Sequence, residues 1–175
     1  MPDAWRLMPP QRSTSKLDPR VAEYNTTIRK RYWEVLAQLA LNWRTDWSAA
    51  RLKALSALPG KGSGIIFTYF SGSDWCVPCK ELHGEVFDSP TFLHWFHGTK
   101  MVPMLVDFPL SAAAQPAATW TQNWELKDHY GVTGYPIVLA IRSSDAKKIA
   151  GFGGYVSGTG PDKWIATFSK ALGIT

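Results

Sequence analysis

The chain contains two cysteines, Cys76 and Cys79, with two residues between them. An apolar run with strand character, residues 65–70, comes just before the pair, and a run with helical character, residues 80–87, follows it. Two cysteines at this spacing, where a strand meets a helix, are typical of dithiol–disulfide chemistry. Unpaired N–H groups and the helix dipole favour an anion at the first cysteine and so lower its thiol pKa. The second cysteine lies one turn further along, close enough to resolve a mixed disulfide.

The same two cysteines also allow two other roles. A zinc site usually needs four ligands, and the chain has no second cysteine pair. His83, four residues beyond Cys79 on the same helix face, would complete only a partial site. Inert, buried cysteines are the second alternative. Pro78 between the cysteines and the strand-to-helix context argue against that alternative, so we expect a redox pair and no bound metal.

Charge is distributed unevenly along the 175 residues, a length that fits one domain with an extension. Residues 1–63 hold 11 Lys and Arg against 5 Asp and Glu, whereas residues 64–175 hold 8 against 9. The basic excess therefore lies outside the cysteine region. Its one run, Arg29-Lys30-Arg31, could contact nucleic acid, but a solvated helix face is the simpler interpretation. We expect no nucleic-acid partner.

Membrane and export signals are not visible in the sequence. No apolar stretch is long enough to span a bilayer, so we expect no membrane span. Residues 1–16 contain charge and proline without an apolar core, so they do not read as a signal peptide. Either the protein is cytoplasmic or its export signal is not part of this sequence. A single cysteine pair does not settle the compartment.

The N-terminal part is predicted to be an extension, residues 1–42, ahead of a folded domain at residues 43–175. Within it, residues 1–17 form a flexible lead-in rich in proline, serine and charge. Asp18 and Pro19 are typical of a helix start, and the helix is expected to run to residue 42. Its apolar residues recur at helical spacing: Val21, Tyr24, Ile28, Tyr32, Val35 and Leu39.

We expect this helix to pack on the folded domain, because burying each apolar side chain of the stripe is worth about 1.5–3 kcal/mol. Deleting residues 1–42 should therefore lower the melting temperature, measured by circular dichroism. An unchanged melting temperature would instead indicate that the stripe binds a partner.

The folded domain is predicted to be α/β. The strand at residues 65–70 is apolar on both faces, as expected of a central strand covered by helices on each side. Strands alternating with helices, then two strands and a final helix, predict a mixed sheet. The other expected strands cover residues 101–108, 136–142 and 147–152, and the expected helices cover residues 48–58, 80–88, 91–97, 120–130 and 161–172, with a loop at residues 109–119.

Two segments together resemble the thioredoxin superfamily. They are Trp-Cys-Val-Pro-Cys-Lys at residues 75–80 and Gly-Val-Thr-Gly-Tyr-Pro at residues 131–136. With residues 87–90, Phe-Asp-Ser-Pro, the chain is similar to the C-terminal domain of the thiol:disulfide interchange protein of cytochrome c biogenesis. The resemblance covers about residues 43–172. It implies a thioredoxin-like three-layer sandwich with a mixed central sheet and helices on both faces, here with an N-terminal helical extension.

The resemblance also implies roles for individual residues. Cys76 would be the attacking thiol and Cys79 the resolving one. Pro136 would follow a cis bond and face the pair, leaving the backbone of Tyr135 to bind a substrate segment; a trans proline opening an edge strand is the alternative. Trp75 would be an exposed platform beside the site rather than a core tryptophan.

Val77 and Pro78 complete the expected substrate-binding surface. They also help to set the redox potential, and they lack the histidine found in strongly oxidising relatives. The resemblance therefore favours a reductant.

One departure from the family concerns the proton of the resolving thiol. Many relatives carry a buried acid on the strand below the cysteines, whereas this chain has Tyr69 and Phe70 there. Asp74 lies too near the motif to be assumed equivalent. Glu81 and His83 are the candidates to relay the proton, since histidine titrates near neutral pH. A packed or solvated histidine is the alternative.

The sequence thus predicts a thiol–disulfide oxidoreductase that acts on protein thiols and disulfides, works with a redox partner protein and binds no organic cofactor. A non-enzymatic binding module is the alternative; it would use the groove at Tyr135 and Pro136, or the N-terminal helix. We expect a monomer. The resemblance favours the periplasm, with the cytoplasm as the alternative.

Overall fold

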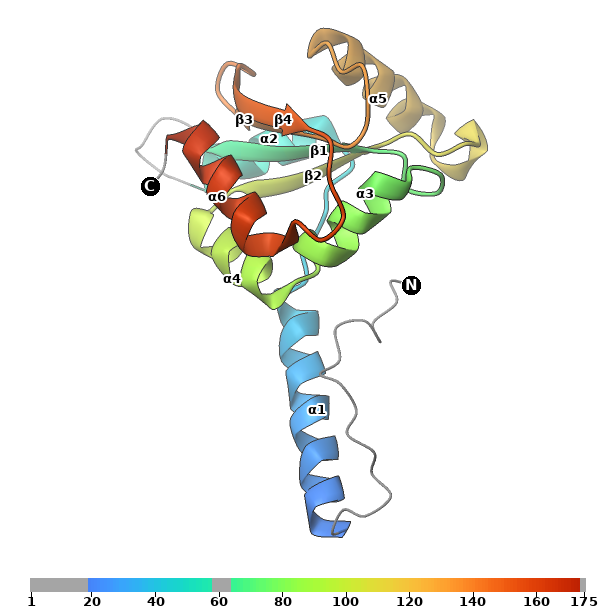
Figure 1. The fold of residues 1–175 in the computed structure, drawn as a ribbon. Coiled ribbons are helices and arrows are strands. Elements are labelled where there is room, and N and C mark those ends of the chain that lie inside the picture. The colour runs from blue at the N-terminus through green and yellow to red at the C-terminus, as the bar shows by residue number, and fades with distance from the viewer. Residues whose placement is uncertain (1–18, 58–63, 174–175) are drawn as a thin grey trace. The chain divides into compact units, whose positions relative to one another are not determined.

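The computed structural model describes residues 19–57 and 64–173. The chain divides into two compact units, Met1–Ala40 and Leu41–Thr175. The first unit contains helix α1 (Pro19–Leu39). The second contains, in order, α2 (Trp47–Ser56), β1 (Ile65–Ser71), α3 (Val77–Leu82), the π-helical turn η2 (His83–Phe87), α4 (Pro90–Thr99), β2 (Val102–Asp107), the 3₁₀ turn η3 (Ala112–Ala114), α5 (Ala117–His129), β3 (Ile137–Arg142), β4 (Lys148–Gly153) and α6 (Gly160–Leu172) (Figure 1).

Helix α1 ends three residues earlier than the sequence predicts. Tyr24, Ile28, Tyr32 and Val35 are exposed on it. The lead-in at residues 1–17 lies outside the described residues, as does the side chain of Val21. The domain boundary after residue 42 and the packing of this helix stay predictions. No helix in the described ranges combines the length and apolar character needed to cross a membrane.

The second unit is built on the predicted mixed sheet. Four strands lie in the order β2-β1-β3-β4, with β1 parallel to β2 and antiparallel to β3, and β3 antiparallel to β4. Tyr69 of β1 pairs with Leu105 of β2, and Phe70 of β1 pairs with Ile137 of β3. Strand β1 is central and almost wholly buried, as its two apolar faces predict.

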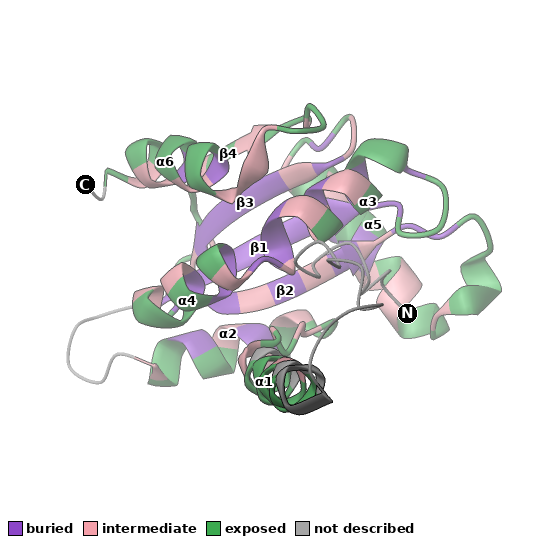
Figure 2. Cartoon of the chain, turned by 60° about the horizontal axis from the view of Figure 1, so that its bottom comes forward, coloured by how far each residue is buried: buried purple, intermediate pink, exposed green. Residues whose placement is uncertain are grey.

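Successive side chains of β1 point to opposite faces of the sheet and enter two separate cores. Phe67 and Tyr69 lie in one core with residues of α3, α4 and α6. Ile66 and Phe70 lie in the other, with residues of α2 and α5. Helices therefore cover both faces, and buried residues concentrate on the strands between them (Figure 2). The three-layer α/β sandwich is confirmed.

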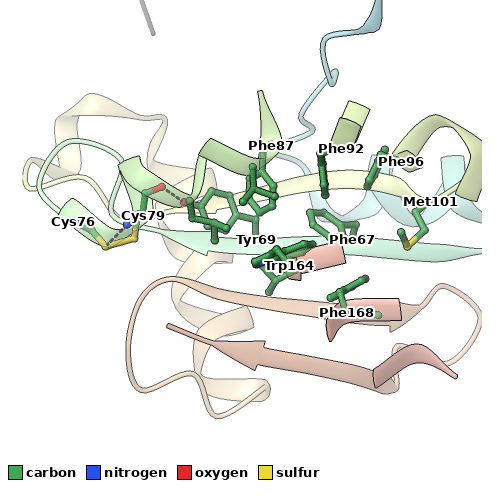
Figure 3. Packing of buried hydrophobic residues seen from close by; sticks show 14 residues of the cluster. Phe67, Tyr69, Cys76, Cys79, Phe87, Phe92, Phe96, Met101, Trp164 and Phe168 are labelled. Carbon is green, nitrogen blue, oxygen red and sulfur yellow. Dashed lines mark hydrogen bonds between the residues drawn. A yellow bond between two sulfur atoms is a disulfide. The ribbon is translucent and has the colours of Figure 1, made fainter. Parts of the chain in front are cut away.

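Half of the buried residues of the first core are aromatic, and Phe67 lies at its centre (Figure 3). Its ring centroid lies 5.1–6.0 Å from six others, in edge-on or tilted contacts of the kind that aromatic quadrupoles favour. These partners are Trp43, Phe87, Phe92, Phe96, Trp164 and Phe168.

Local capping explains where several helices begin. Asp46 accepts a hydrogen bond from the Ala49 N–H at the start of α2. Ser89 accepts one from the Phe92 N–H, with proline next to it at the start of α4.

Two predicted boundaries need correction. Helix α5 begins at Ala117 instead of residue 120, so the predicted loop at residues 109–119 is shorter and contains η3. Pro116 precedes the helix in an extended conformation, and the alanines after it are strong helix formers. The helix predicted at residues 80–88 begins at Val77 and changes to π-helical geometry from His83 to Phe87.

Candidate redox site

The two cysteines are joined by a disulfide at the start of α3, with a Cα–Cα distance of 5.2 Å. Cys76 is the N-cap residue of this helix, and its sulfur accepts a hydrogen bond of 3.3 Å from the Cys79 N–H (Figure 3). The Cys76 N–H donates to the Gly72 carbonyl oxygen at 2.8 Å, which closes the turn between β1 and α3. The first sulfur thus lies where helix N–H groups stabilise a thiolate.

Both cysteines are buried in the oxidised state. Cys76 retains 4% of its surface and Cys79 retains 1%. The residues between them behave differently, since Val77 and Pro78 are both exposed. Cys76 is therefore the more accessible of the two cysteines, and it adjoins the exposed surface of Val77 and Pro78.

Trp75 lies on the surface beside the disulfide and is 43% exposed, so it is not a core tryptophan. Its indole N–H donates a 2.7 Å hydrogen bond to the Phe108 carbonyl oxygen. A Cβ atom on Gly72 would lie only 2.4 Å from the indole ring, so glycine leaves the space that the tryptophan occupies. The Trp75 and Tyr135 rings contact each other edge to face, with 5.7 Å between centroids.

Tyr135 and Pro136 immediately precede β3. The Tyr135–Pro136 bond is cis, as the resemblance implies. Pro136 is buried, and its carbonyl oxygen accepts a hydrogen bond of 2.8 Å from the Gly154 N–H. The pairing of Phe70 with Ile137 places Pro136 beside the end of β1 that leads into the cysteine motif. Contact between Pro136 and the disulfide, and its role in the reaction, stay predictions.

Below the cysteines, a tyrosine occupies the region where relatives carry an acid. The Tyr69 hydroxyl donates to the Cys79 carbonyl oxygen at 2.9 Å (Figure 3). The Ser71 hydroxyl donates to the Tyr69 oxygen at 3.1 Å. Both residues are almost completely buried, and burial raises the pKa of Tyr69 well above its ordinary value. The pair therefore acts as a neutral support for α3. The sequence shows that the acid is missing, but it does not reveal the contact of Tyr69 with Cys79, because that contact depends on how β1 packs against α3.

Replacing Tyr69 with phenylalanine should lower the free energy of unfolding by about 1–3 kcal/mol, because it removes two hydrogen bonds and leaves the buried Ser71 hydroxyl without its acceptor. The Cys79 carbonyl oxygen should add little to this loss because it also accepts the His83 N–H of its own helix. Urea unfolding of the oxidised protein would measure the change. Tyr130→Phe is the matched control for a lost hydroxyl, since Tyr130 donates to the Ala146 carbonyl oxygen in the other half of the domain. An unchanged unfolding free energy for Tyr69→Phe would show that this contact contributes nothing.

The two candidate relay residues lie beyond α3's first turn. His83 packs against the rings of Trp43, Tyr69 and Phe87, and its Nε2 lies 3.5 Å from an Asp88 oxygen. Within residues 64–173, no side-chain hydrogen bond joins Glu81 or His83 to either cysteine; the His83 backbone N–H donates to the Cys79 carbonyl oxygen as part of the helix. Their relay role stays a prediction. Among all described residues, no group of three or more His, Cys, Asp or Glu is placed to hold a metal ion.

Glu85 ties the helical segment after the cysteines to the glycine-rich loop after β4. Its carboxylate accepts hydrogen bonds from the Tyr155 hydroxyl at 2.6 Å, the Ser157 hydroxyl at 2.8 Å and the Gly158 N–H at 2.8 Å. Burial together with this carboxylate raises the pKa of Tyr155 to about 12. The hydroxyl therefore remains a donor at physiological pH, and the loop is held to η2.

The turn before the cysteines is also connected to the end of β2 and to the loop after it, which the sequence did not indicate. The Ser73 N–H and hydroxyl donate to the two Asp107 carboxylate oxygens at 2.8 and 2.5 Å. In return, the Leu110 N–H donates to the Asp74 carboxylate at 3.1–3.2 Å. The two loops are therefore held together next to the disulfide.

Comparison with known proteins agrees with this geometry. Residues 52–169 match the family model of the thioredoxin-like domain. A disulfide bond reductase, DsbH, of Chlamydia pneumoniae is 36% identical over 88 residues, which are 50% of this chain and 51% of that protein. The thioredoxin-related protein DsbJ of the same organism is 30% identical over 119 residues, 67% of this chain and 32% of that protein.

A solved structure of a DsbH oxidoreductase is 29% identical, with a TM-score of 0.65 over 77% of this chain and 86% of that one. The chain spans about half the length of one curated relative and about a third of the other. The family model covers most of the folded unit and more than half of the whole sequence. This protein therefore belongs to the thioredoxin-like domain family.

Proposed function

We propose that this protein is a thiol–disulfide oxidoreductase that exchanges its Cys76–Cys79 pair with protein substrates. The observation that carries the proposal is the disulfide at the N-terminus of α3, with the Cys79 N–H directed at the Cys76 sulfur. In the reduced protein, the same N–H and the helix dipole would stabilise a Cys76 thiolate, which is the attacking species.

The exchange proceeds in two balanced steps. The Cys76 thiolate attacks one sulfur of a substrate disulfide, forms a mixed disulfide and displaces the other substrate sulfur as a thiolate. Cys79 then loses its proton and attacks the Cys76 sulfur, which releases the second substrate thiolate. The substrate gains two electrons and takes up two protons, and the Cys76–Cys79 disulfide forms. A redox partner protein must return two electrons before the next cycle.

We propose reduction of substrates as the physiological direction. Val77 and Pro78 between the cysteines include no histidine, and the DsbH relative is a disulfide bond reductase. The Tyr69–Ser71 pair below the disulfide contributes hydrogen bonds and no charge. No fixed charge there would favour the thiolate form strongly enough to make the pair a strong oxidant.

A redox titration of the Cys76–Cys79 pair against glutathione and dithiothreitol buffers tests both statements. We expect a potential closer to that of thioredoxin, about −270 mV, than to that of the oxidant DsbA, about −120 mV. A potential near the second value would overturn the reductant assignment. A pair that titrates but never turns over a protein disulfide would overturn the enzyme assignment in favour of a binding module.

We further propose a periplasmic monomer with protein substrates and one redox partner, on the strength of the family resemblance. Sedimentation of the purified chain tests the oligomeric state. Osmotic-shock release from cells that express the full gene product tests the compartment, and retention with cytoplasmic markers would contradict the proposed location.

A further inference from the structure

A continuous series of aromatic rings runs from the cysteine motif to the outer part of α5. Trp75 contacts Tyr135, Tyr135 contacts Phe108, and Phe108 contacts Trp124, with centroid distances of 5.7, 5.3 and 5.3 Å. Trp120 joins the far end, 6.5 Å from Phe108 and 6.0 Å from Trp124. The disulfide site and α5 therefore share one aromatic surface.

Much of this aromatic surface is open to solvent although it is apolar. Trp75 is 43% exposed and Trp124 is 41% exposed, while Phe108 is buried beneath them. Leu110, in the loop between β2 and α5, is 78% exposed. Exposed apolar side chains that gather beside a reactive site commonly mark an interaction site.

The aromatic surface is held in place by hydrogen bonds from below and from the side. The Trp75 indole donates to Phe108, and the Leu110 N–H is bound by the Asp74 carboxylate. The buried Asn123 side chain of α5 donates to the Asp107 carbonyl oxygen at 2.9 Å. A partner would therefore meet a preformed surface and lose little binding free energy to ordering it.

We propose that Leu110, Trp120 and Trp124 form a specificity site for an apolar or aromatic side chain of the substrate polypeptide. This inference rests on the proposed function and extends it to a substrate class. The aromatic surface begins at Trp75, the neighbour of Cys76 in the chain, so a segment lying on it can also bring a cysteine to Cys76. A second copy of this chain or a membrane would not need to lie beside the cysteines, so the position of the surface favours a substrate polypeptide.

The contact distances limit where the recognised side chain can lie. Three centroid steps of 5.3–5.7 Å separate Trp75 from Trp124. An extended strand rises about 3.3 Å per residue, so the bound side chain lies within about five residues of the substrate cysteine. The site would therefore read the sequence beside the cysteine, not a remote feature of the substrate.

The test uses the full chain and pairs of disulfide-linked peptides that differ only by tryptophan or serine at positions one to five on either side of the cysteine. Oxidised glutathione serves as a substrate without a flanking segment. For the wild-type protein, the kcat/KM ratio of the tryptophan peptide to the serine peptide should reach about tenfold at one or more positions, as expected for a buried aromatic anchor.

Trp124→Ala and Leu110→Ser should each reduce that ratio toward one. The matched control is Leu52→Ser, which removes a leucine that is 68% exposed on α2 and should leave the ratio unchanged.

Each outcome separates this inference from the proposed function. If the wild-type protein reduces oxidised glutathione but shows no preference between the peptides, the specificity site is overturned and the proposed function is not. If the wild-type protein reduces no disulfide, including oxidised glutathione, the proposed function is overturned. Leu110 is largely exposed, so Leu110→Ser provides a readout even if Trp124→Ala unfolds. A wild-type dimer that Trp124→Ala dissociates, with the peptide ratio unchanged, would also overturn the inference and assign the surface to a second copy.

Discussion

Cys76→Ser should reduce disulfide-reducing activity to the uncatalysed rate, while Cys79→Ser should accumulate mixed disulfides with its substrates. The reason is the position of the two sulfurs. Cys76 caps α3 and is the more exposed of the two residues, at 4%, whereas Cys79 lies inside the first turn and is 1% exposed. Loss of Cys76 removes the nucleophile, and loss of Cys79 removes only the group that releases the intermediate.

Insulin reduction would measure the activity of both variants, and non-reducing electrophoresis with mass spectrometry would identify the trapped adducts. Iodoacetamide at mildly acidic pH provides an independent check, because it should modify Cys76 before Cys79 in the reduced wild-type protein. The double serine variant is the control for adducts that form by other routes. Preferential labelling of Cys79, or a Cys79→Ser variant with full turnover and no adducts, would contradict the assigned roles.

Phe67→Ala should lower the free energy of unfolding by about 3–5 kcal/mol, the range measured for truncating a buried aromatic side chain. Phe67 has no exposed surface, and its ring contacts aromatic residues from α4, α6, η2 and the segment before α2. The neighbouring rings come from four separate parts of the backbone. They cannot all move inward to fill the cavity, so we expect a value toward the upper end.

Thermal unfolding of the oxidised protein would show the effect as a fall in melting temperature of about 6–20 °C, given about 2–4 °C per kcal/mol for a chain of this size. Phe67→Leu is the control, since it keeps most of the volume and should cost much less. The disulfide is present in both variants, so the difference reports on packing alone. A fall in melting temperature of less than about 2 °C corresponds to a loss of no more than about 1 kcal/mol in the free energy of unfolding. Such a result for Phe67→Ala would contradict the central position of this ring.

Local features of the sequence were sufficient for the fold class and for the cysteine pair. An apolar run followed by Cys76 and a proline-containing helix start indicates strand, turn and helix without reference to the rest of the chain. The serine and proline at residues 89–90 indicate the start of α4 in the same way. These signals depend on neighbours within one or two turns, so a single sequence carries them.

Only the tertiary structure showed what surrounds the disulfide. Tyr69 supports Cys79 because the pleat of β1 turns its side chain toward α3, and the register of the sheet decides which residues share that face. Tyr135 reaches Trp75, and Phe108 reaches Trp124, across long separations in the sequence. No periodicity or capping pattern encodes such pairs, because they depend on how strands and helices pack. The sequence by itself therefore determined the reaction centre, and packing between distant segments decided its support and its outer surface.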